Sequence, residues 1–149
     1  MTWFNIIVQN IYLEDWDWNV TVYYAVDTYY IDEIIDEMIN MGCRDVDVIK
    51  AEYLLKKGSY NVGFTYSNFR DQNSIVVIGL TSTPEEFQNT FDHEKGHLAM
   101  HIGKALDIDI FGEDFQYLTG EIGQKMFKVA KNFMCEHCRN KMDFRISCK

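Results

Sequence analysis

Residues 83–97 have the sequence TPEEFQNTFDHEKGH, and this stretch marks the clearest structural boundary in the chain. Thr83 is suited to cap a helix, and Pro84 is typical of the first helical position. Glu86, three residues after the threonine, completes the pattern of a capping box. The sequence therefore predicts a helix that begins here and continues toward Leu106.

The chain before this helix carries strand patterns. Apolar and polar residues alternate in residues 4–11 and again in residues 20–26, and residues 13–18 can turn a hairpin between them. Two further strands are predicted at residues 61–67 and 74–80, joined by a polar loop. The N-terminal half is therefore expected to supply a mostly antiparallel sheet.

Helical spacing appears in two other places. Apolar residues recur at this spacing in residues 31–39, and Gly42 is placed to end that helix. Residues 45–55 suit either a strand or a helix. After a loop at residues 107–112, a last helix carries an apolar stripe from Phe115 to Phe133. Because strands come first and the long helices last, the predicted class is α+β with one helix packed on the sheet.

The bulk composition fits a single domain over residues 1–149. Hydrophobic residues make up 47% of the chain and aromatic residues 15%, which opposes disorder. The formal net charge of −9 opposes binding to a phosphate backbone, so no nucleic acid partner is expected. No apolar run is long enough for a membrane span, and no basic segment precedes one, so we expect a cytoplasmic protein without a membrane partner.

The motif with chemical content is His93-Glu94-Lys95-Gly96-His97. Residues four apart on a helix differ by about 40° in direction and about 6 Å in height, so both imidazoles leave from one flank. Two neutral ring nitrogens can then reach a single zinc ion at about 2 Å each. Glu94 points elsewhere and can act on a water molecule instead of binding the metal.

This motif and its surroundings resemble the zincin metallopeptidases. The resemblance lies in a strand, the helical stretch 89–97, a short loop and a second helix. More narrowly, residues 90–120 resemble small H-E-x-x-H proteins encoded by bacteria and their phages. In those proteins the second helix often carries a glutamate and then a Tyr-Leu-x-Gly turn, which correspond here to Glu113 and residues 117–120. The resemblance implies a minimal zincin-like fold in which residues 81–134 hold the metal-site helices.

A third metal ligand must come from outside the motif. His101 lies about 12 Å from His93 along the helix axis, too far for both to bind one ion. The metzincin pattern also fails, because Met100 and Gly103 stand where it needs glycine and histidine. Carboxylates of the second helix remain. The resemblance favours Glu113, with Glu121 and Asp114 as alternatives, although Glu113 also suits a simple interaction with the helix dipole.

The resemblance also implies a reaction. A metal-bound water would attack the peptide carbonyl while Glu94 acts as general base, and Tyr117 could stabilise the oxyanion or simply be a buried aromatic residue. In zincins an edge strand beside the site pairs with an extended peptide, and its counterpart here would be residues 61–67 or 74–80.

The cysteines form an incomplete pattern in the tail, residues 135–149. Cys135 and Cys138 are a C-x-x-C pair, and Cys148 follows. Together with Cys43 or His137 they could complete a structural zinc site, but the second spaced pair of a typical site is missing. Reduced thiols without a metal are the simpler interpretation in a cytoplasmic protein.

Two functions from different classes follow. The first is a zinc-dependent metallopeptidase acting on a peptide or protein substrate. The second is a zincin-fold structural or interaction protein without turnover, for example a phage virion or accessory component whose partners are its neighbours in the assembly. Its location would then be a virion or another assembly formed in the bacterial cytoplasm. A metal-dependent hydrolase of other bonds is a third possibility.

Overall fold

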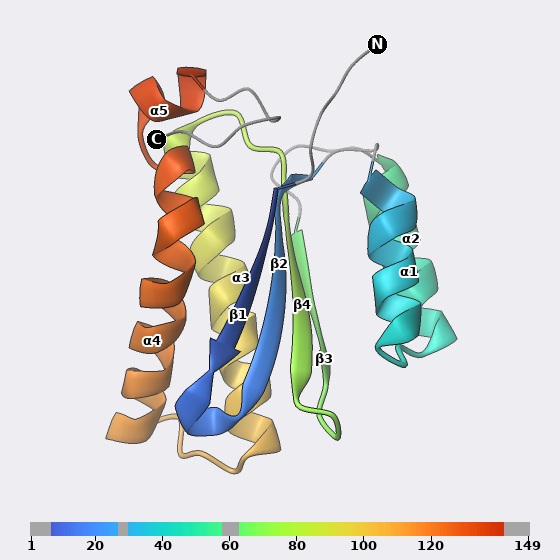
Figure 1. The fold of residues 1–149 in the computed structure, drawn as a ribbon, viewed down its shortest axis with the longest axis vertical. Helices are drawn as coiled ribbons and strands as arrows, with labels where there is room; N and C mark the ends of the chain where they lie inside the picture. Colours follow the sequence, from blue (N-terminus) through green and yellow to red (C-terminus); the bar gives the residue numbers. More distant parts are fainter. Residues whose placement is uncertain (1–6, 27–29, 58–62, 142–149) are drawn as a thin grey trace.

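The structure is a computed structural model that describes residues 7–26, 30–57 and 63–141. Its centre is a four-stranded sheet with helices on both faces, as Figure 1 shows. The strands are β1 (Ile7–Leu13), β2 (Trp18–Val26), β3 (Gly63–Asn68) and β4 (Asn73–Gly79). The predicted α+β class is confirmed. Residues 4–6 and 61–62, which the predicted strands included, lie outside the described residues.

The sheet is mixed, with the strand order β1-β2-β4-β3. The β1–β2 and β4–β3 pairs are antiparallel, whereas β2 and β4 are parallel to each other. The two hairpins are the local pairings that the sequence predicted. The parallel pairing joins them, and it leaves β1 and β3 as the outer strands of the sheet.

Two helices cover each face of this sheet. On one side are α1 (Ile31–Asn40) and α2 (Asp45–Lys57), and on the other are α3 (Pro84–Ala105) and α4 (Glu113–Ala130). Two 3-10 turns, Glu14–Trp16 and Lys131–Phe133, and the short helix α5 (Glu136–Lys141) complete the described elements.

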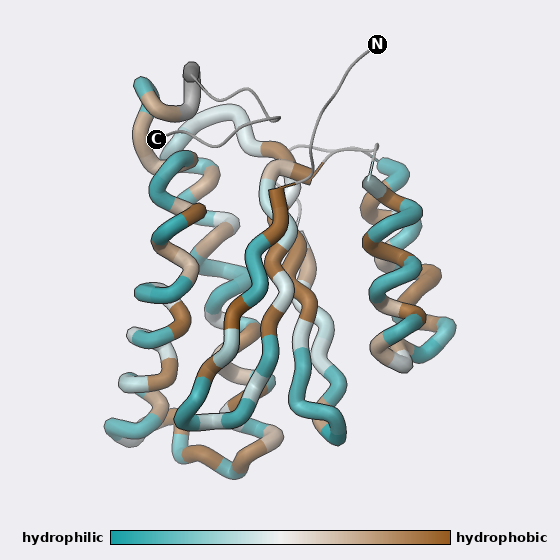
Figure 2. Tube along the Cα trace, in the orientation of Figure 1, coloured by the Kyte–Doolittle hydropathy of each residue, from teal (hydrophilic) through white to brown (hydrophobic). Residues whose placement is uncertain are grey.

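Alternation along the central strands divides the core between the two faces. Val22 of β2 and Val76 of β4 pack toward α3 and α4, whereas Tyr23 and Val77 pack toward α1 and α2. β4 is therefore buried on both faces, which explains its continuous apolar sequence. Figure 2 shows apolar segments along the middle strands and helices whose turns alternate between polar and apolar.

Local signals placed the helix ends correctly. Gly42 has a φ of 80°, and its N–H donates to Ile39 O at 2.9 Å while Cys43 N–H donates to Met38 O at 3.0 Å. These bonds form a Schellman motif, and they confirm that Gly42 ends the helix as predicted. The segment 45–55, which suited either a strand or a helix, lies in α2. Two helices, where the sequence indicated one, therefore cover that face of the sheet.

The predicted start of α3 is confirmed in detail. Thr83 Oγ1 accepts a hydrogen bond from Glu86 N–H at 3.1 Å, and Pro84 is the first helical residue. The Glu86 carboxylate accepts from Ser82 N–H at 3.1 Å, so it reaches one residue further back than in the usual capping box. The bond to Thr83 satisfies a backbone donor that the first turn of a helix otherwise leaves free, and the bond from Ser82 fixes the chain just before the cap.

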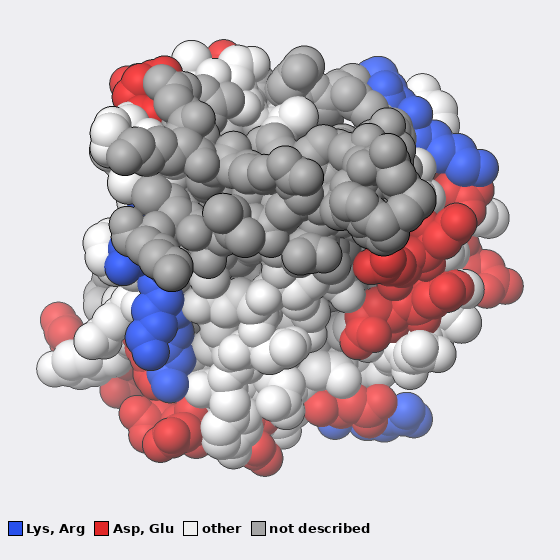
Figure 3. All heavy atoms as spheres, turned by 45° about the horizontal axis from the view of Figure 1, so that its top comes forward, with Lys and Arg blue, Asp and Glu red and all other residues white. Residues whose placement is uncertain are grey.

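Acidic side chains dominate part of the surface. On the face shown in Figure 3 they gather on the side of α1 and α2, while basic side chains form small groups. The exposed side of α1 carries Asp32, Glu33 and Asp36. Like charges of this kind repel a phosphate backbone. Among the described residues, no helix combines the length and the apolar character that crossing a membrane requires.

Candidate metal centre

The helix α3 brings His93 and His97 together on one flank. Both side chains are exposed, and their Nε2 atoms are 3.1 Å apart. The ring centroids are 4.7 Å apart and the rings are nearly perpendicular, at 80°. Two nitrogens at about 2.05 Å from one zinc ion would be about 3.1–3.4 Å apart for angles of about 100–110° at the metal. The pair therefore has the separation that two ligands of one ion need.

Glu94 lies in the same turn, about 60–100° around the helix from the two histidines, and only 4% of its surface is exposed. Thr65 Oγ1 donates to Glu94 Oε1 at 3.0 Å, and it also lies 3.3 Å from the Glu94 backbone oxygen. A Cβ atom on Gly63 would lie 3.0 Å from Glu94 Cγ and 3.1 Å from Oε2. The strand β3 therefore packs directly on this carboxyl group and holds its position.

Burial is the main influence on the Glu94 carboxyl group, and it raises the pKa above its ordinary value. The hydrogen bond from Thr65 and the nearby charges of His97 and His93 act in the opposite direction. Since both imidazoles influence the carboxylate, Glu94 is within electrostatic reach of any cation that the pair binds. A carboxylate with a raised pKa is a better proton acceptor near neutral pH than an exposed one.

One turn further along α3, His101 is partly buried against β3. Its Nδ1 atom is 2.8 Å from Ser67 Oγ, and its ring centroid lies 6.4 Å from that of His97. Burial lowers the pKa of His101, and the charges of His97 and Lys104 add to this effect. His101 is therefore beside the pair, but β3 holds it.

The outer position of β3 decides which strand is free to bind a peptide. β4 pairs with β2 on one side and with β3 on the other, whereas β3 pairs with β4 alone among the described strands. Of the two strands that the sequence proposed for this role, only β3 has a free edge. Gly63, Thr65 and Ser67 alternate along β3, and all three contact α3.

The carboxylates predicted as third ligands have surroundings of their own on α4. Glu113 and Asp114 are exposed in the first turn of α4, where they line an open cavity of about 510 Å³ with the loop that follows α3. Glu121 forms an ion pair with Lys125 at 3.8 Å. Tyr117, predicted as an oxyanion donor, is 67% exposed.

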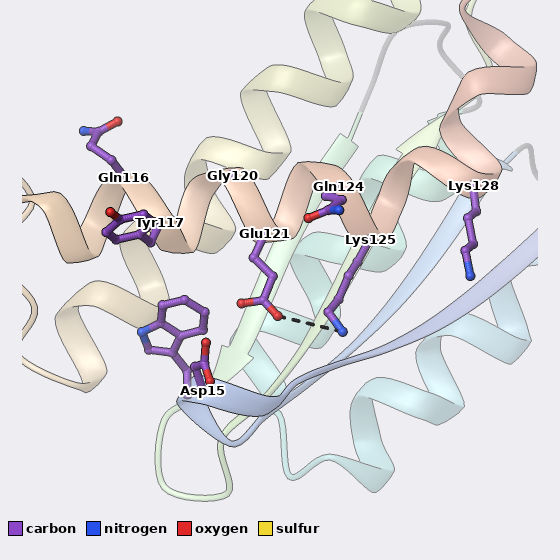
Figure 4. A pocket seen from close by; sticks show the side chains of 9 residues that line it. Asp15, Gln116, Tyr117, Gly120, Glu121, Gln124, Lys125 and Lys128 are labelled. Atoms are coloured by element: carbon purple, nitrogen blue, oxygen red, sulfur yellow. Dashed lines mark ion pairs between the residues drawn. The ribbon is translucent and has the colours of Figure 1, made fainter.

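Glu121 and Tyr117 line a second cavity of about 760 Å³ between α4 and the turn after β1, shown in Figure 4. Asp15 is on the opposite wall of that cavity. His93, Glu94 and His97 line neither cavity.

The two helices α3 and α4 pack together through the flank of α3 that carries Lys95. Lys95 Nζ lies 3.5 Å from the position of a Cβ on Gly123, so α4 packs on the flank of α3 that carries Lys95. At about 100° per residue, His93 and His97 point about 160° away from Lys95. Within the described part of the chain, no group of three or more His, Cys, Asp or Glu side chains is arranged to hold a metal ion.

The cysteines are also separated. Cys43 lies between α1 and α2 and packs with the core on that face, whereas Cys135 and Cys138 lie at the start of α5, beyond α4. Cys138 N–H donates to Cys135 Sγ at 3.5 Å, and this bond is the main cause that lowers the pKa of Cys135. Cys148 lies outside the described residues.

Sequence reasoning missed the residues of β3 that support the site. Gly63, Thr65 and Ser67 are small or polar at alternate positions, while Phe64 and Tyr66 occupy the positions between them. One signal could have revealed these residues. The strand β3 has a face of small or polar side chains, and β4 and the histidine-bearing helix α3 follow it in sequence. A small residue lets the helix approach, and a hydroxyl can bond to its side chains.

Comparisons of this chain with protein-family models, with curated proteins and with solved structures find no match. The function of this chain is therefore inferred from the geometry of its site.

Proposed function

We propose that this chain is a zinc-dependent hydrolase of peptide bonds, in which His93 and His97 bind the metal and Glu94 is the general base. One observation carries the proposal. The two Nε2 atoms converge to 3.1 Å, and the buried carboxyl group of Glu94 lies in the helical turn between them. Neutral imidazoles can also hydrogen-bond at this separation, but the pair together with an adjacent buried acid is the arrangement that two zinc ligands and a general base require.

The residues present fit an incomplete zinc site. Zinc prefers four ligands, and a catalytic site usually has three from the protein. The described residues supply two nitrogen ligands, so the remaining positions are left to water, to substrate or to a ligand from beyond these residues. We therefore expect weaker binding than the roughly 10–16 kcal/mol of structural zinc sites with four protein ligands.

The chemical roles of the chain follow from burial and hydrogen bonding. A bound zinc ion would supply a Lewis acid that polarises a carbonyl group and lowers the pKa of a water molecule. Glu94 accepts the proton of the attacking water and returns it to the leaving amine. Its raised pKa favours the first transfer, and the hydrogen bond from Thr65 fixes its orientation during both.

The substrate surface is the free edge of β3. Among the described strands this edge has no neighbour, so its N–H and C=O groups can add an extended peptide as a further strand, a recurring mode of peptide binding. The same strand contacts Glu94 through Gly63 and Thr65. A peptide on this edge would therefore run alongside the turn of α3 that carries the histidine pair.

Metal analysis and one substitution test this proposal. Equilibrium dialysis should give one zinc ion per chain, and His93→Ala and His97→Ala should each abolish it, while His137→Ala should not. Glu94→Gln should retain the metal and lose peptide hydrolysis by at least about 100-fold. A protein that binds no zinc, or a Glu94→Gln variant with full turnover, would contradict the proposal.

A second candidate function is a protein that binds a partner through a shared metal ion. It is favoured by the exposure of both histidines and by the lack of a third ligand among the described residues. In that case zinc should promote association, which sedimentation velocity with and without zinc would detect. Glu94→Gln should leave that association unchanged, whereas it should abolish turnover in the first candidate.

A further inference from the structure

A continuous chain of hydrogen bonds connects the core to the flank of α3. Trp18 Nε1 lies 2.8 Å from Ser74 Oγ, which lies 2.6 Å from Ser67 Oγ, which lies 2.8 Å from His101 Nδ1. Trp18 is fully buried and Ser74 is 1% exposed. Ser67 and Ser74 are paired residues of β3 and β4, so the sheet register itself brings the two hydroxyl groups together.

The direction of this chain follows from its first member. An indole N–H can only donate, so Ser74 Oγ accepts from Trp18. Ser74 has one hydroxyl hydrogen, and Ser67 Oγ is its one other hydrogen-bond partner among the described residues. If Ser74 donates to Ser67, the Ser67 hydroxyl is free to donate to His101 Nδ1.

The opposite direction leaves a buried donor without a partner. If His101 donated from Nδ1 to Ser67, and Ser67 donated to Ser74, the Ser74 hydroxyl hydrogen would have no acceptor. A buried unsatisfied donor is strongly disfavoured, and solvent does not reach Ser74. A third arrangement, in which Ser67 accepts from both Ser74 and His101, leaves the Ser67 hydroxyl hydrogen without a partner among the described residues. The forward direction gives every hydroxyl hydrogen a partner, and in it Nδ1 of His101 is the acceptor. The proton of the neutral ring is then on Nε2.

With this tautomer, the Nε2–H group of His101 is a hydrogen-bond donor on the flank of α3. His101 has no further hydrogen bond among the described residues, so its Nε2–H is left for a ligand or for solvent. Its ring is 6.4 Å from that of His97, centroid to centroid, on the same side of the helix. The His101 ring is therefore a neighbour of the His97 ring, and Nε2 is the ring nitrogen that Ser67 leaves available.

We infer that the Trp18–Ser74–Ser67 chain holds His101 as the neutral Nε2–H tautomer, and that this N–H donates to a carboxylate or another oxyanion bound beside His97. The tautomer depends on the hydrogen-bond chain alone. The role toward an oxyanion rests on the proposed function, because it requires a metal ion on His93 and His97. In that role His101 contacts the ligand and does not bind the metal.

The tautomer is tested on the metal-free protein by nitrogen-15 NMR of the imidazole groups. The chain has four histidines, and His101→Phe identifies the signal of His101. We expect one protonated Nε2 and one unprotonated Nδ1 in the unaltered protein. Ser74→Ala should release this preference and give a mixture of tautomers, while the exposed Ser82→Ala should change nothing. A protonated Nδ1, or an unchanged tautomer in Ser74→Ala, would overturn the assignment.

The donor role is tested with cobalt(II) as the metal and acetate as the oxyanion, both followed by visible absorption. His101→Phe should bind cobalt within about twofold of the unaltered protein and bind acetate about tenfold more weakly or worse, since a bond to a charged acceptor is lost. Equal acetate affinity would overturn the donor role. Loss of cobalt in His101→Phe would make His101 a ligand and overturn it as well.

The two proposals fail in different ways. If the unaltered protein binds no cobalt, the proposed function and the donor role are wrong, whereas the NMR result on the tautomer stands or falls by itself. If cobalt binds and His93→Ala abolishes it, the metal site is supported whatever the acetate measurement gives.

Discussion

Two substitutions of glycine by alanine should change stability in opposite directions. A Cβ on Gly63 would lie 2.8 Å from Val77 O, a backbone atom of the neighbouring strand, and 3.0 Å from Glu94 Cγ. Side-chain Cβ atoms in proteins essentially never approach backbone oxygens so closely. Because β3 and β4 are held together by their ladder, neither side can move without stretching hydrogen bonds or displacing Glu94.

The magnitude follows from the cost of overpacking. One additional methyl group in a well-packed site costs about 1–3 kcal/mol. For a domain of this size each kcal/mol lowers the melting temperature by about 2–4 °C, so Gly63→Ala should lower it by roughly 2–12 °C. The displaced β3 should also release Glu94 toward solvent, and its pKa should fall toward the ordinary value.

Gly96→Ala is the matched control. Gly96 is in the same helical turn as Glu94 and His97, but a Cβ there meets no atom within 4 Å. Because glycine is about 0.8–1.0 kcal/mol less favourable than alanine inside a helix, this substitution should stabilise the protein by about 1 kcal/mol. Thermal and urea denaturation followed by circular dichroism would measure both variants. A neutral or stabilising Gly63→Ala would refute the close packing of β3 on Glu94.

Three further outcomes are expected. Glu94→Gln should raise the free energy of unfolding at pH 7, because the raised pKa of Glu94 means that its burial opposes the charged form. The stability gained by this variant should disappear as the pH falls below the ordinary pKa of glutamate, where Glu94 is protonated in both the folded and the unfolded protein. Urea denaturation at pH 7 and pH 4 would test this. An equal gain in stability at both pH values would contradict it. Thr83→Ala should cost about 1 kcal/mol through loss of the bond to Glu86 N–H, while Ser82→Ala should cost less than about 0.5 kcal/mol. Cys135 should react with iodoacetamide at pH 7.5 faster than Cys43, since a hydrogen bond lowers the pKa of the first thiol and burial raises that of the second; peptide mapping by mass spectrometry that finds Cys43 the faster would contradict this.

The sequence predicted the elements that local chemistry determines. The start of α3 depends on Thr83, Pro84 and Glu86, which are neighbours in the chain, and the end of α1 depends on the positive φ of Gly42. Residues 45–55 were ambiguous because their apolar residues fit both periods. In the structure Ala51 and Leu55 are buried, and their spacing of four residues is that of a helix.

The arrangement of the site depended on contacts that a single sequence does not reveal. α3 buries residues over a wide arc, including Phe91, Leu98 and Gly103, so its sequence does not show which flank meets α4. The structure packs α4 beside Lys95, about 160° around α3 from the histidine pair. The convergence of His93 and His97, by contrast, was predictable because it needs only one helix.

Among the described residues, the side chains that make and support the candidate centre come from one stretch, residues 63–101, with Trp18 as the single distant contributor. A systematic mutational scan should accordingly divide in two. Substitutions in β1, α2 and α4 would act on the amount of folded protein and leave the chemistry per molecule unchanged. Substitutions in the β3–β4–α3 stretch would alter both the amount of folded protein and the chemistry per molecule. Among the early residues, Trp18 alone would show this double effect.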